Sequence, residues 1–391
     1  MSTITAANAT QLYQALKVAQ AGDTIALEGG SYASLRLFNL TFANDVTITS
    51  KDPGNPAIMT DLQIKNSSGL NFTNIEVFVD AAKGGWGLQV NDSRDIHFDQ
   101  ISVHGSMDNN PQNDLSGMSI RNSSDVSVTN SEFQQLMIGV NHLNSDHISF
   151  TGNKIHDIQM DGIRGGGSSY VTISNNHFTN FYPIATDHPD AIQFWTTATT
   201  TSAHHIVISD NLIERGDGKA MQGVFMGDES GGKLPYLDTI ITGNMVVGSL
   251  WHGITAGSNV RVLIENNTVL GYDGMGARIT LADSSDVILK NNLATAYLRQ
   301  RIVEVDVDTG NVTIPTTSTG GLMEISQWAA NKLANAGLSG QGFDIWQSWT
   351  PQVTLPTPYG PGPVTEYNYH YNSEELQHLL VNLNRFESLF F

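Results

Sequence analysis

Short runs of alternating apolar and polar residues recur through the middle of the chain, and each run closes on an asparagine. These asparagines are Asn153, Asn176, Asn211, Asn244, Asn267 and Asn292. Alternation with a period of two predicts short β-strands that bury one face. Recurrence at a near-constant interval predicts a repeat architecture in which each unit stacks on the next.

A second short strand in each repeat opens with a small residue followed by an apolar one. The openings are at Gly139, Gly162, Ala191, Gly223 and Gly253, with looser copies at Gly87 and Gly117. One turn of the chain therefore holds roughly 22 to 25 residues and two or three strands.

This period predicts an all-β fold, a right-handed parallel β-helix. Each strand would pair with its copy in the next turn about 4.8 Å away, and the asparagines would form an internal ladder of amide hydrogen bonds. A leucine-rich repeat has a similar period but needs a leucine scaffold that this chain lacks. A β-propeller has a longer period.

The two ends of the chain do not follow the repeat. An amphipathic helix is predicted over residues 6–20, so residues 1–21 would cap the open edge of the coil. We expect the coil over residues 22–298. Residues 299–391 form an extension that would cap the coil, pack along it or bind a partner. Helices are predicted there over 327–336 and 373–390, with a proline-rich linker over 351–363.

Charge and composition exclude several classes of function. The chain has 391 residues, with 19 Lys and Arg against 38 Asp and Glu, and a formal net charge of −19. Nucleic acid is therefore not an expected partner. The chain has no cysteine, which excludes disulfides and thiolate metal sites. No apolar run approaches the ~18 residues of a membrane span, and no Sec signal peptide is visible.

Two adjacent repeats carry insertions. The intervals between ladder asparagines are 23, 35, 33, 23 and 25 residues, so the second and third are about ten residues longer. A β-helix accepts insertions at its corners, and such loops commonly carry function. The inserted segments are 182–190, 196–203, 216–220 and 227–236.

Polar residues share two positions of the second strand in these same repeats. Asp161, Asp190, Gln222 and His252 fall at the corner just before the strand, and Arg164, Gln193, Phe225 and Thr255 fall at its first outward position. Because equivalent positions stack, these side chains should gather on one flank beneath the inserted loops. The sequence Asp187-His188-Pro189-Asp190 lies at the same place.

Three kinds of chemistry fit this set of residues. In β-elimination or C5 epimerisation of a uronate, His188 would act as base. Arg164, Lys219 or a calcium ion bound by Asp161, Asp187 and Asp190 would neutralise the carboxylate. No cofactor besides calcium is suggested.

In hydrolysis, two carboxylates flank the glycosidic bond. Asp161 and Asp190 on neighbouring turns would supply them, with Asp187 farther away. The third option is binding without turnover. Candidate substrate-binding residues, chosen for amide or aromatic surface, are Tyr182, Gln193, Trp195, Gln222, Phe225 and His252. Phe194 shares parity with the inward Ile192 and should be core, whereas Trp251 could face either way.

The repeats over residues 22–292 resemble the pectate-lyase-like superfamily of right-handed β-helices. The segment AGDTIALEGGSY looks like the first turn of alginate lyases and chondroitinase B. Mannuronan C5-epimerases carry an Asp-Pro-His-acid motif, and this chain has Asp187-His188-Pro189-Asp190, with the middle pair exchanged. The Asn-Thr-Asp and Gly-His-Gly motifs of polygalacturonases are absent, which disfavours hydrolysis of that type.

The resemblance implies an enzyme that cleaves or epimerises an acidic extracellular polysaccharide. The alternatives are a glycoside hydrolase and a non-catalytic phage tailspike or adhesin. A homotrimer joined through the C-terminal extension is a further expectation for the tailspike or adhesin. The expected location is extracellular or virion-associated, without a Sec signal peptide. Polysaccharide is the expected partner.

Overall fold

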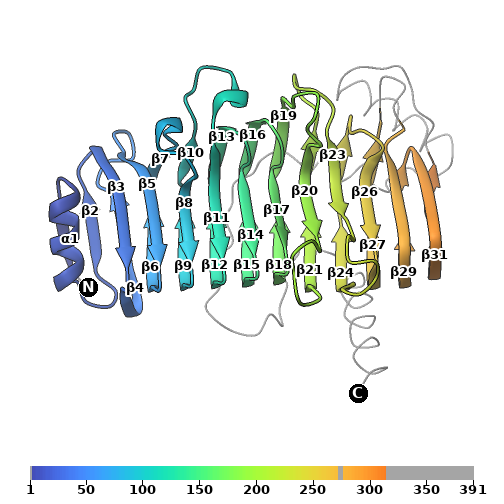
Figure 1. Cartoon of the computed structure of the whole chain (residues 1–391), viewed down its shortest axis with the longest axis horizontal. Helices are drawn as coiled ribbons and strands as arrows, with labels where there is room; N and C mark the ends of the chain where they lie inside the picture. The colour runs from blue at the N-terminus through green and yellow to red at the C-terminus, as the bar shows by residue number, and fades with distance from the viewer. Residues whose placement is uncertain (1, 272–275, 314–391) are drawn as a thin grey trace. The chain divides into compact units, whose positions relative to one another are not determined.

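The computed structural model describes residues 2–271 and 276–313. In this part of the chain, 32 strands stack side by side, and every pair of named strands is parallel. Figure 1 shows the strands as successive rungs of one elongated coil. The predicted right-handed parallel β-helix is confirmed.

Most rungs contain three strands, which build three faces that we call A, B and C. Face A contains β8 (Trp86–Asn91), β11 (Ser116–Arg121), β14 (Val140–Leu143), β17 (Ile163–Gly166), β20 (Asp190–Trp195), β23 (Gln222–Met226) and β26 (His252–Gly257), joined by β5 (Ala57–Lys65) and the start of β29 (Arg278–Lys290).

Face B follows face A in each rung. It contains β1 (Thr3–Ala6), β2 (Thr24–Leu27), β4 (Thr41–Ser50), β6 (Ser68–Thr73), β9 (Arg94–Asp99), β12 (Ser124–Thr129), β15 (Asp146–Thr151), β18 (Ser169–Ser174), β21 (His204–Ser209), β24 (Tyr236–Thr242), β27 (Asn259–Glu265) and the end of β29.

Face C completes the rung. It contains β7 (Ile75–Phe78), β10 (Ser102–His104), β13 (Glu132–Leu136), β16 (Lys154–Ile158), β19 (His177–Phe181), β22 (Leu212–Glu214), β25 (Met245–Val247), β28 (Thr268–Leu270), β30 (Leu293–Ala294) and β32 (Val312–Thr313). Near the ends, β3 (Gly30–Phe38) pairs with β5, and β31 (Ala296–Thr309) pairs with β29.

The core is a column of inward side chains at alternate strand positions. On face A, Ile163, Ile192, Val224 and Ile254 stack in register and are at most 1% exposed. Burying one such side chain contributes roughly 1.5–3 kcal/mol. The column therefore fixes which residues of each strand point outward.

The predicted asparagine ladder is present inside the corner between faces B and C. Each Nδ2 donates to the Oδ1 of the next asparagine at 2.9–3.0 Å, from Asn153 through Asn292. Asn311 continues the ladder by one more step. The ladder satisfies buried amides that a core would otherwise leave unpaired.

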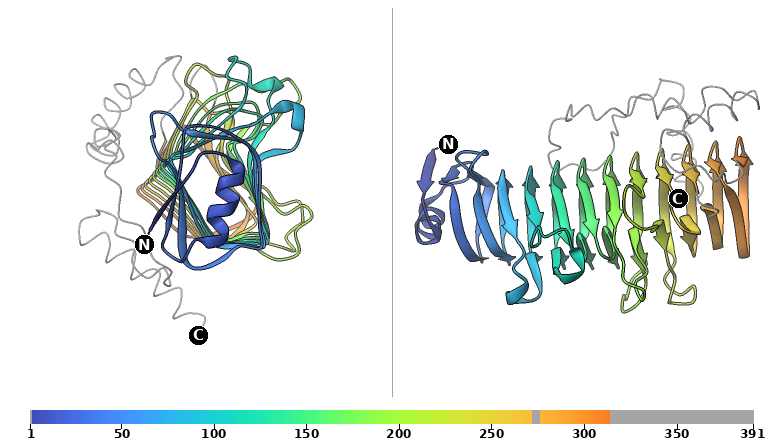
Figure 2. Two further views of the ribbon diagram at one scale, coloured as in Figure 1. Left: turned by 90° about the vertical axis from the view of Figure 1, so that its left-hand side faces the viewer. Right: turned by 90° about the horizontal axis from the view of Figure 1, so that it is seen from above.

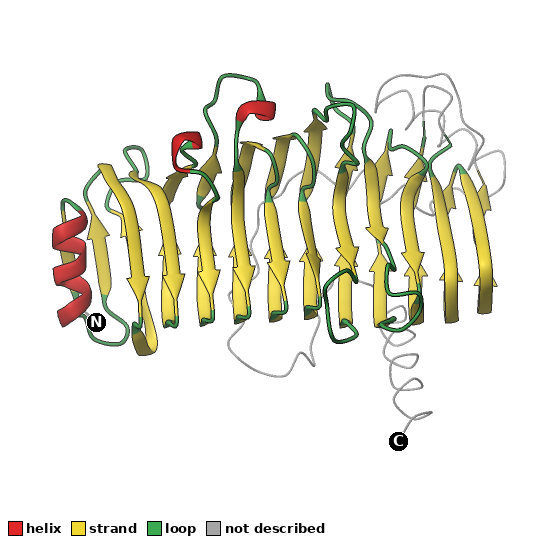
Figure 3. Ribbon diagram, viewed as in Figure 1, coloured by secondary structure: helices red, strands yellow, loops and turns green. Residues whose placement is uncertain are grey.

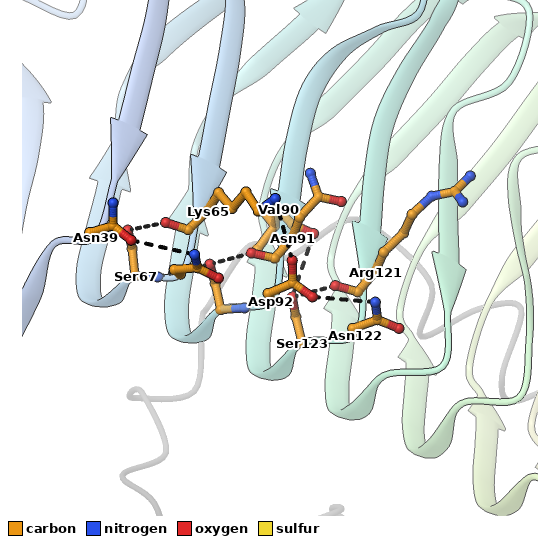
Figure 4. A network of polar contacts seen from close by, with 11 residues as sticks. Asn39, Lys65, Ser67, Val90, Asn91, Asp92, Arg121, Asn122 and Ser123 are labelled. Atoms are coloured by element: carbon orange, nitrogen blue, oxygen red, sulfur yellow. Dashed lines mark hydrogen bonds and ion pairs between the residues drawn. The ribbon is translucent and has the colours of Figure 1, made fainter.

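A second ladder lies at the corner between faces A and B, and sequence reasoning missed it. The backbone N–H of each serine donates to the Oγ of the next, through Ser67, Ser93, Ser123, Ser145 and Ser168. Figure 4 shows part of this corner, where turn residues also bond between rungs. The sequence signal is a serine directly after an Asn, Asp or Gly that turns the chain.

The N-terminal end is closed by α1 (Ala9–Val18), as predicted. Asn8 caps the helix by accepting a hydrogen bond from the backbone N–H of Gln11, and Leu12 and Leu16 are buried. Figure 2 shows α1 lying across the first rung. β1 precedes the helix and pairs with β2, which follows it, and this pairing was not predicted.

The coil extends beyond the predicted boundary at residue 298. β31 and β32 form another rung, with Val303 and Val305 in the apolar positions. The boundary was wrong because the last ladder interval, from Asn292 to Asn311, is only 19 residues and hides the repeat. The helices predicted over 327–336 and 373–390 lie outside the described residues.

The insertions leave the coil at the two corners that border face A. Segments 182–189 and 215–221 join face C to face A, and segments 196–203 and 227–235 join face A to face B. Figure 3 shows these loops in green above and below the strands. Two further loops contain the short 3-10 helices η1 (Ala81–Lys83) and η2 (Pro111–Asn113). Face A is therefore bordered by loops on both edges.

Candidate functional site

Asp190 is the first residue of β20, and its side chain is wholly buried. Its Oδ2 accepts a hydrogen bond from Gln193 Nε2 at 2.8 Å and lies 3.1 Å from Nδ1 of His188. The His188 side chain, at the end of an inserted loop, is 55% exposed. An exposed imidazole is therefore held by a buried carboxylate.

The protonation of these two groups is linked. Burial raises the pKa of Asp190 to about 7, although the hydrogen bond from His188 acts in the opposite direction. The hydrogen bond to Asp190 raises the pKa of His188. Asp190 Oδ1 is buried and has no hydrogen-bond partner among the described residues. The pair therefore retains a proton near neutral pH.

Asp161 lies beside Asp190 on the neighbouring rung, as the register predicted. Its Oδ1 accepts a hydrogen bond from the backbone N–H of Asp190, and its Oδ2 accepts one from Arg164 Nη1 at 2.9 Å. Burial raises the pKa of Asp161, and the Arg164 charge opposes that rise. The Arg164 guanidinium also lies 5.6 Å from the ring centre of Trp195. The Arg164 guanidinium is therefore held between the Asp161 carboxylate and the Trp195 ring.

Phe225 stands between two histidines on face A. Its ring centre lies 5.6 Å from that of His188 and 5.1 Å from that of His252, in edge-on contacts. His252 Nδ1 is 2.9 Å from Thr255 Oγ1, and the His252 backbone N–H donates to Gln222 Oε1. Burial lowers the pKa of His252, and the nearby positive charge of Arg278 adds to this effect.

Three other predicted site residues brace the inserted loops. Asp187 Oδ2 accepts hydrogen bonds from Gln159 Nε2 and from the backbone N–H of Ile184, each at 2.9 Å. Lys219 Nζ donates to the backbone carbonyl of Pro183 at 3.0 Å. The carbonyl of Tyr182 accepts from a glutamine of the η2 loop, Gln112.

Calcium binding by the three aspartates stays a prediction, and their carboxylates have different partners in the structure. Asp161 faces Arg164, Asp190 faces His188, and Asp187 faces its own loop. Within the described residues, the group of His, Asp and Glu whose ligand atoms come within 4.8 Å of one another is Asp45, Asp95 and His97 on face B.

The structure also places the side chains of two further aromatic residues of this region. Phe194 is core, as its parity predicted, with 1% exposure. Trp251 is 53% exposed, and the guanidinium of Arg278 lies 5.6 Å from its ring centre. Arg278 was not among the predicted residues, because no further opening of the second strand was recognised in the sequence after Gly253.

Comparison with known proteins supports the fold. The profile of the family described as right handed beta helix region matches residues 56–182 and 86–294, which together cover more than half of the chain. No curated protein matches. In the described part of the chain, no helix is long and apolar enough to cross a membrane.

Several solved structures are similar to this chain. PfbA, a surface adhesin of Streptococcus pneumoniae, is 12% identical with a TM-score of 0.50, over 80% of this chain and 92% of that one. A lacto-N-biosidase from Eubacterium ramulus is 12% identical with a TM-score of 0.49, over 81% and 67%. The A-module of an Azotobacter vinelandii mannuronan C-5 epimerase is 11% identical with a TM-score of 0.45, over 78% and 93%.

At 12% identity, the likeness to the adhesin structure is one of fold alone. The repeat, the three stacked faces and the profile match agree with one another and with the predicted resemblance. The chain belongs to the right-handed β-helix family.

Proposed function

We propose that face A, between Arg164 and His252, binds an acidic polysaccharide and cleaves it by β-elimination or epimerises it at C5. The observation that carries this proposal is the exposed imidazole of His188, held by the buried carboxylate of Asp190 next to a fixed arginine. Such polymers lie outside cells, so the protein would act there.

Burial of the acids favours elimination over hydrolysis. Two-carboxylate hydrolysis requires both carboxyl groups to flank the scissile bond. The side chains of Asp161 and Asp190 are only 2% and 0% exposed, whereas His188 is open to solvent. Proton transfer by histidine is therefore better supported than attack by a carboxylate pair.

The environments of the two histidines differ in the way that an acid and a base require. His252 has a lowered pKa and is neutral at pH 7, so it would take the C5 proton of a uronate stacked on Phe225. His188 has a raised pKa and would donate a proton. This reverses the role of base that the sequence suggested for His188.

In the elimination, the C5–H electron pair forms the C4=C5 double bond as the C4–O bond breaks. His188 would protonate the departing oxygen, and Arg164 would stabilise the charge that develops on the uronate carboxylate. In epimerisation, the proton would return to C5 from the opposite face of the sugar. Both reactions use the same residues.

Incubation with a panel of polysaccharides separates the alternatives. Ultraviolet absorbance from unsaturated uronates identifies a lyase, and new reducing ends without absorbance identify a hydrolase. Altered uronate stereochemistry in NMR spectra without cleavage identifies an epimerase. Binding without any of these changes identifies an adhesin, and would contradict the proposed catalysis.

Substitution of Asp190 tests the site itself. Asp190→Asn should lower turnover by about 10²–10⁴-fold, because His188 loses its carboxylate partner. The fold should persist, as judged by circular dichroism. The matched control is Asp146→Asn, which removes the carboxylate partner of His147 on face B and should leave turnover unchanged. Full activity in Asp190→Asn would remove this site assignment.

A further inference from the structure

Two arginine–tryptophan pairs stand at opposite ends of the His188–Phe225–His252 group. Arg164 on β17 lies over Trp195, and Arg278 at the start of β29 lies over Trp251, each at 5.6 Å. Register pairing joins β17, β20, β23, β26 and β29 as consecutive strands of face A. At ~4.8 Å per rung the two arginines are separated by about 19 Å along the coil.

Among the residues that the structure describes, Arg278 has no acidic partner of the kind that usually accompanies a half-buried arginine. Its backbone pairs with His252, and its buried Nε has no hydrogen-bond partner among the described residues. Arg164 binds Asp161 through Nη1, but its Nε is likewise buried and unpartnered within the described part of the chain. Unused donors on a fixed planar cation suit a carboxylate ligand.

We propose that Arg278, stacked on Trp251, forms a second anion subsite that binds a uronate carboxylate of an oligosaccharide extending along face A from Arg164. This inference deepens the proposed function, on which it rests. It assigns the substrate class as a polyuronate several sugars long, with one sugar on Phe225 and charged sugars toward both ends.

The charge of the whole chain explains why two such subsites are needed. The net charge of −19 opposes the approach of a polyanion. A cation at each end of the face would offset this repulsion locally. It would also discriminate against neutral glycans, because an arginine that remains unpaired in a half-buried site is unfavourable.

Binding of defined oligosaccharides to the full chain tests this proposal. The probes are hexasaccharides and disaccharides of mannuronate and of galacturonate, and carboxyl-reduced hexasaccharides, titrated by calorimetry. Arg278→Gln should weaken binding of whichever charged hexasaccharide the unmodified chain binds more tightly. The expected loss of affinity is about tenfold or more, as for the loss of a hydrogen bond to a charged group. The same substitution should not change binding of the carboxyl-reduced hexasaccharide. Arg278→Lys should recover only part of the affinity for the charged hexasaccharide.

Arg261→Gln is the matched control, since it removes an arginine paired with Asp238 on face B. It should bind every probe as the unmodified chain does. Thermal melting shows whether each variant is folded. Unchanged affinity in a folded Arg278→Gln variant would overturn the proposal, as would failure of both charged hexasaccharides to bind the unmodified chain.

The two proposals fail in different ways. If charged hexasaccharides bind in this pattern but no polyuronate is converted, the anion subsite stands and the catalytic proposal falls. If polyuronate is converted while the affinity and KM of Arg278→Gln equal those of the unmodified chain, catalysis stands and the subsite falls.

Discussion

His188 and His252 lie on either side of one phenylalanine, yet they hold protons with different affinity. The difference arises from their neighbours: a buried carboxylate beside His188, and burial with a nearby arginine for His252. The two histidines are therefore suited to the opposite roles proposed for them. This arrangement has a direct consequence for the pH dependence of activity.

Activity should follow a bell-shaped curve with pH. The proposed base, His252, is neutral above its lowered pKa, and the proposed acid, His188, stays charged up to its raised pKa. Activity should therefore be highest between the two pKa values. Asp190→Asn should shift the alkaline limb of kcat/KM to lower pH, because the hydrogen bond that raises the His188 pKa is weakened. Residual activity suffices to measure this profile, and an unchanged alkaline limb would exclude His188 as the acid.

At the residue scale, sequence reasoning succeeded where the repeat register decided the outcome. Asp161 and Asp190 stack because both precede an inward isoleucine by two positions. Sequence reasoning failed where the conformation of a loop decided the contacts of a side chain. Asp187 was expected on the loop, as a calcium ligand or a more distant carboxylate. It folds back onto Ile184, and no spacing in the chain indicates that contact.

At the scale of the element, the asparagine ladder gives the rungs from Asn153 to Asn311 the same anchor. Asn211 Oδ1 accepts from both the backbone N–H and the Nδ2 of Asn176, and its own Nδ2 donates to the carbonyl of Ile173 and to Asn244. This rung also carries long insertions. The ladder therefore holds the strands of the candidate site in register while the corners vary.

Asn211→Ala should destabilise the protein by about 3 kcal/mol or more, because several buried groups lose their partners at once. The midpoint of urea unfolding measures the change. Asn71→Ala, which removes a half-buried asparagine that makes a single long contact with Thr47 on face B, is the control and should cost less than about 1 kcal/mol. Equal midpoints for the two variants would show that the ladder adds no stability.

Elements were predictable to the extent that they follow the repeat. Alternation identified the coil, its inward positions and the corners that carry insertions. The serine ladder was overlooked because serine is common in turns and gives no apolar signal. The last rung was overlooked because its ladder interval is short, although Val303 and Val305 alternate as in earlier rungs.

At the scale of the molecule, the acidic surface and the few cations of face A act over different distances. At ~0.01 M salt the Debye length is about 30 Å, and at ~0.15 M it is about 8 Å. The net charge of −19 therefore dominates a polyanion's approach at low salt. In the proposed complex, the arginine contacts would dominate only after the polymer has docked.

The association rate of a polyuronate hexasaccharide should therefore rise as salt increases over this range. Stopped-flow fluorescence would measure it, since Trp195 and Trp251 lie beside the two arginines. A carboxyl-reduced hexasaccharide should show no such dependence. A rate that falls steadily from the lowest salt would mean that local positive potential outweighs the net charge.

The homotrimer remains a prediction that sedimentation would test.

The rung-by-rung pairing of face A also bears on how such proteins diversify. Because His188, Phe225, His252 and Arg278 belong to successive coils, duplication or loss of one complete coil would lengthen or shorten the distance between the end cations by a fixed step. The hydrophobic column and the asparagine ladder would close again around the change. Selectivity for longer or shorter glycans could thus arise from a single in-frame duplication or deletion, without redesign of any side chain.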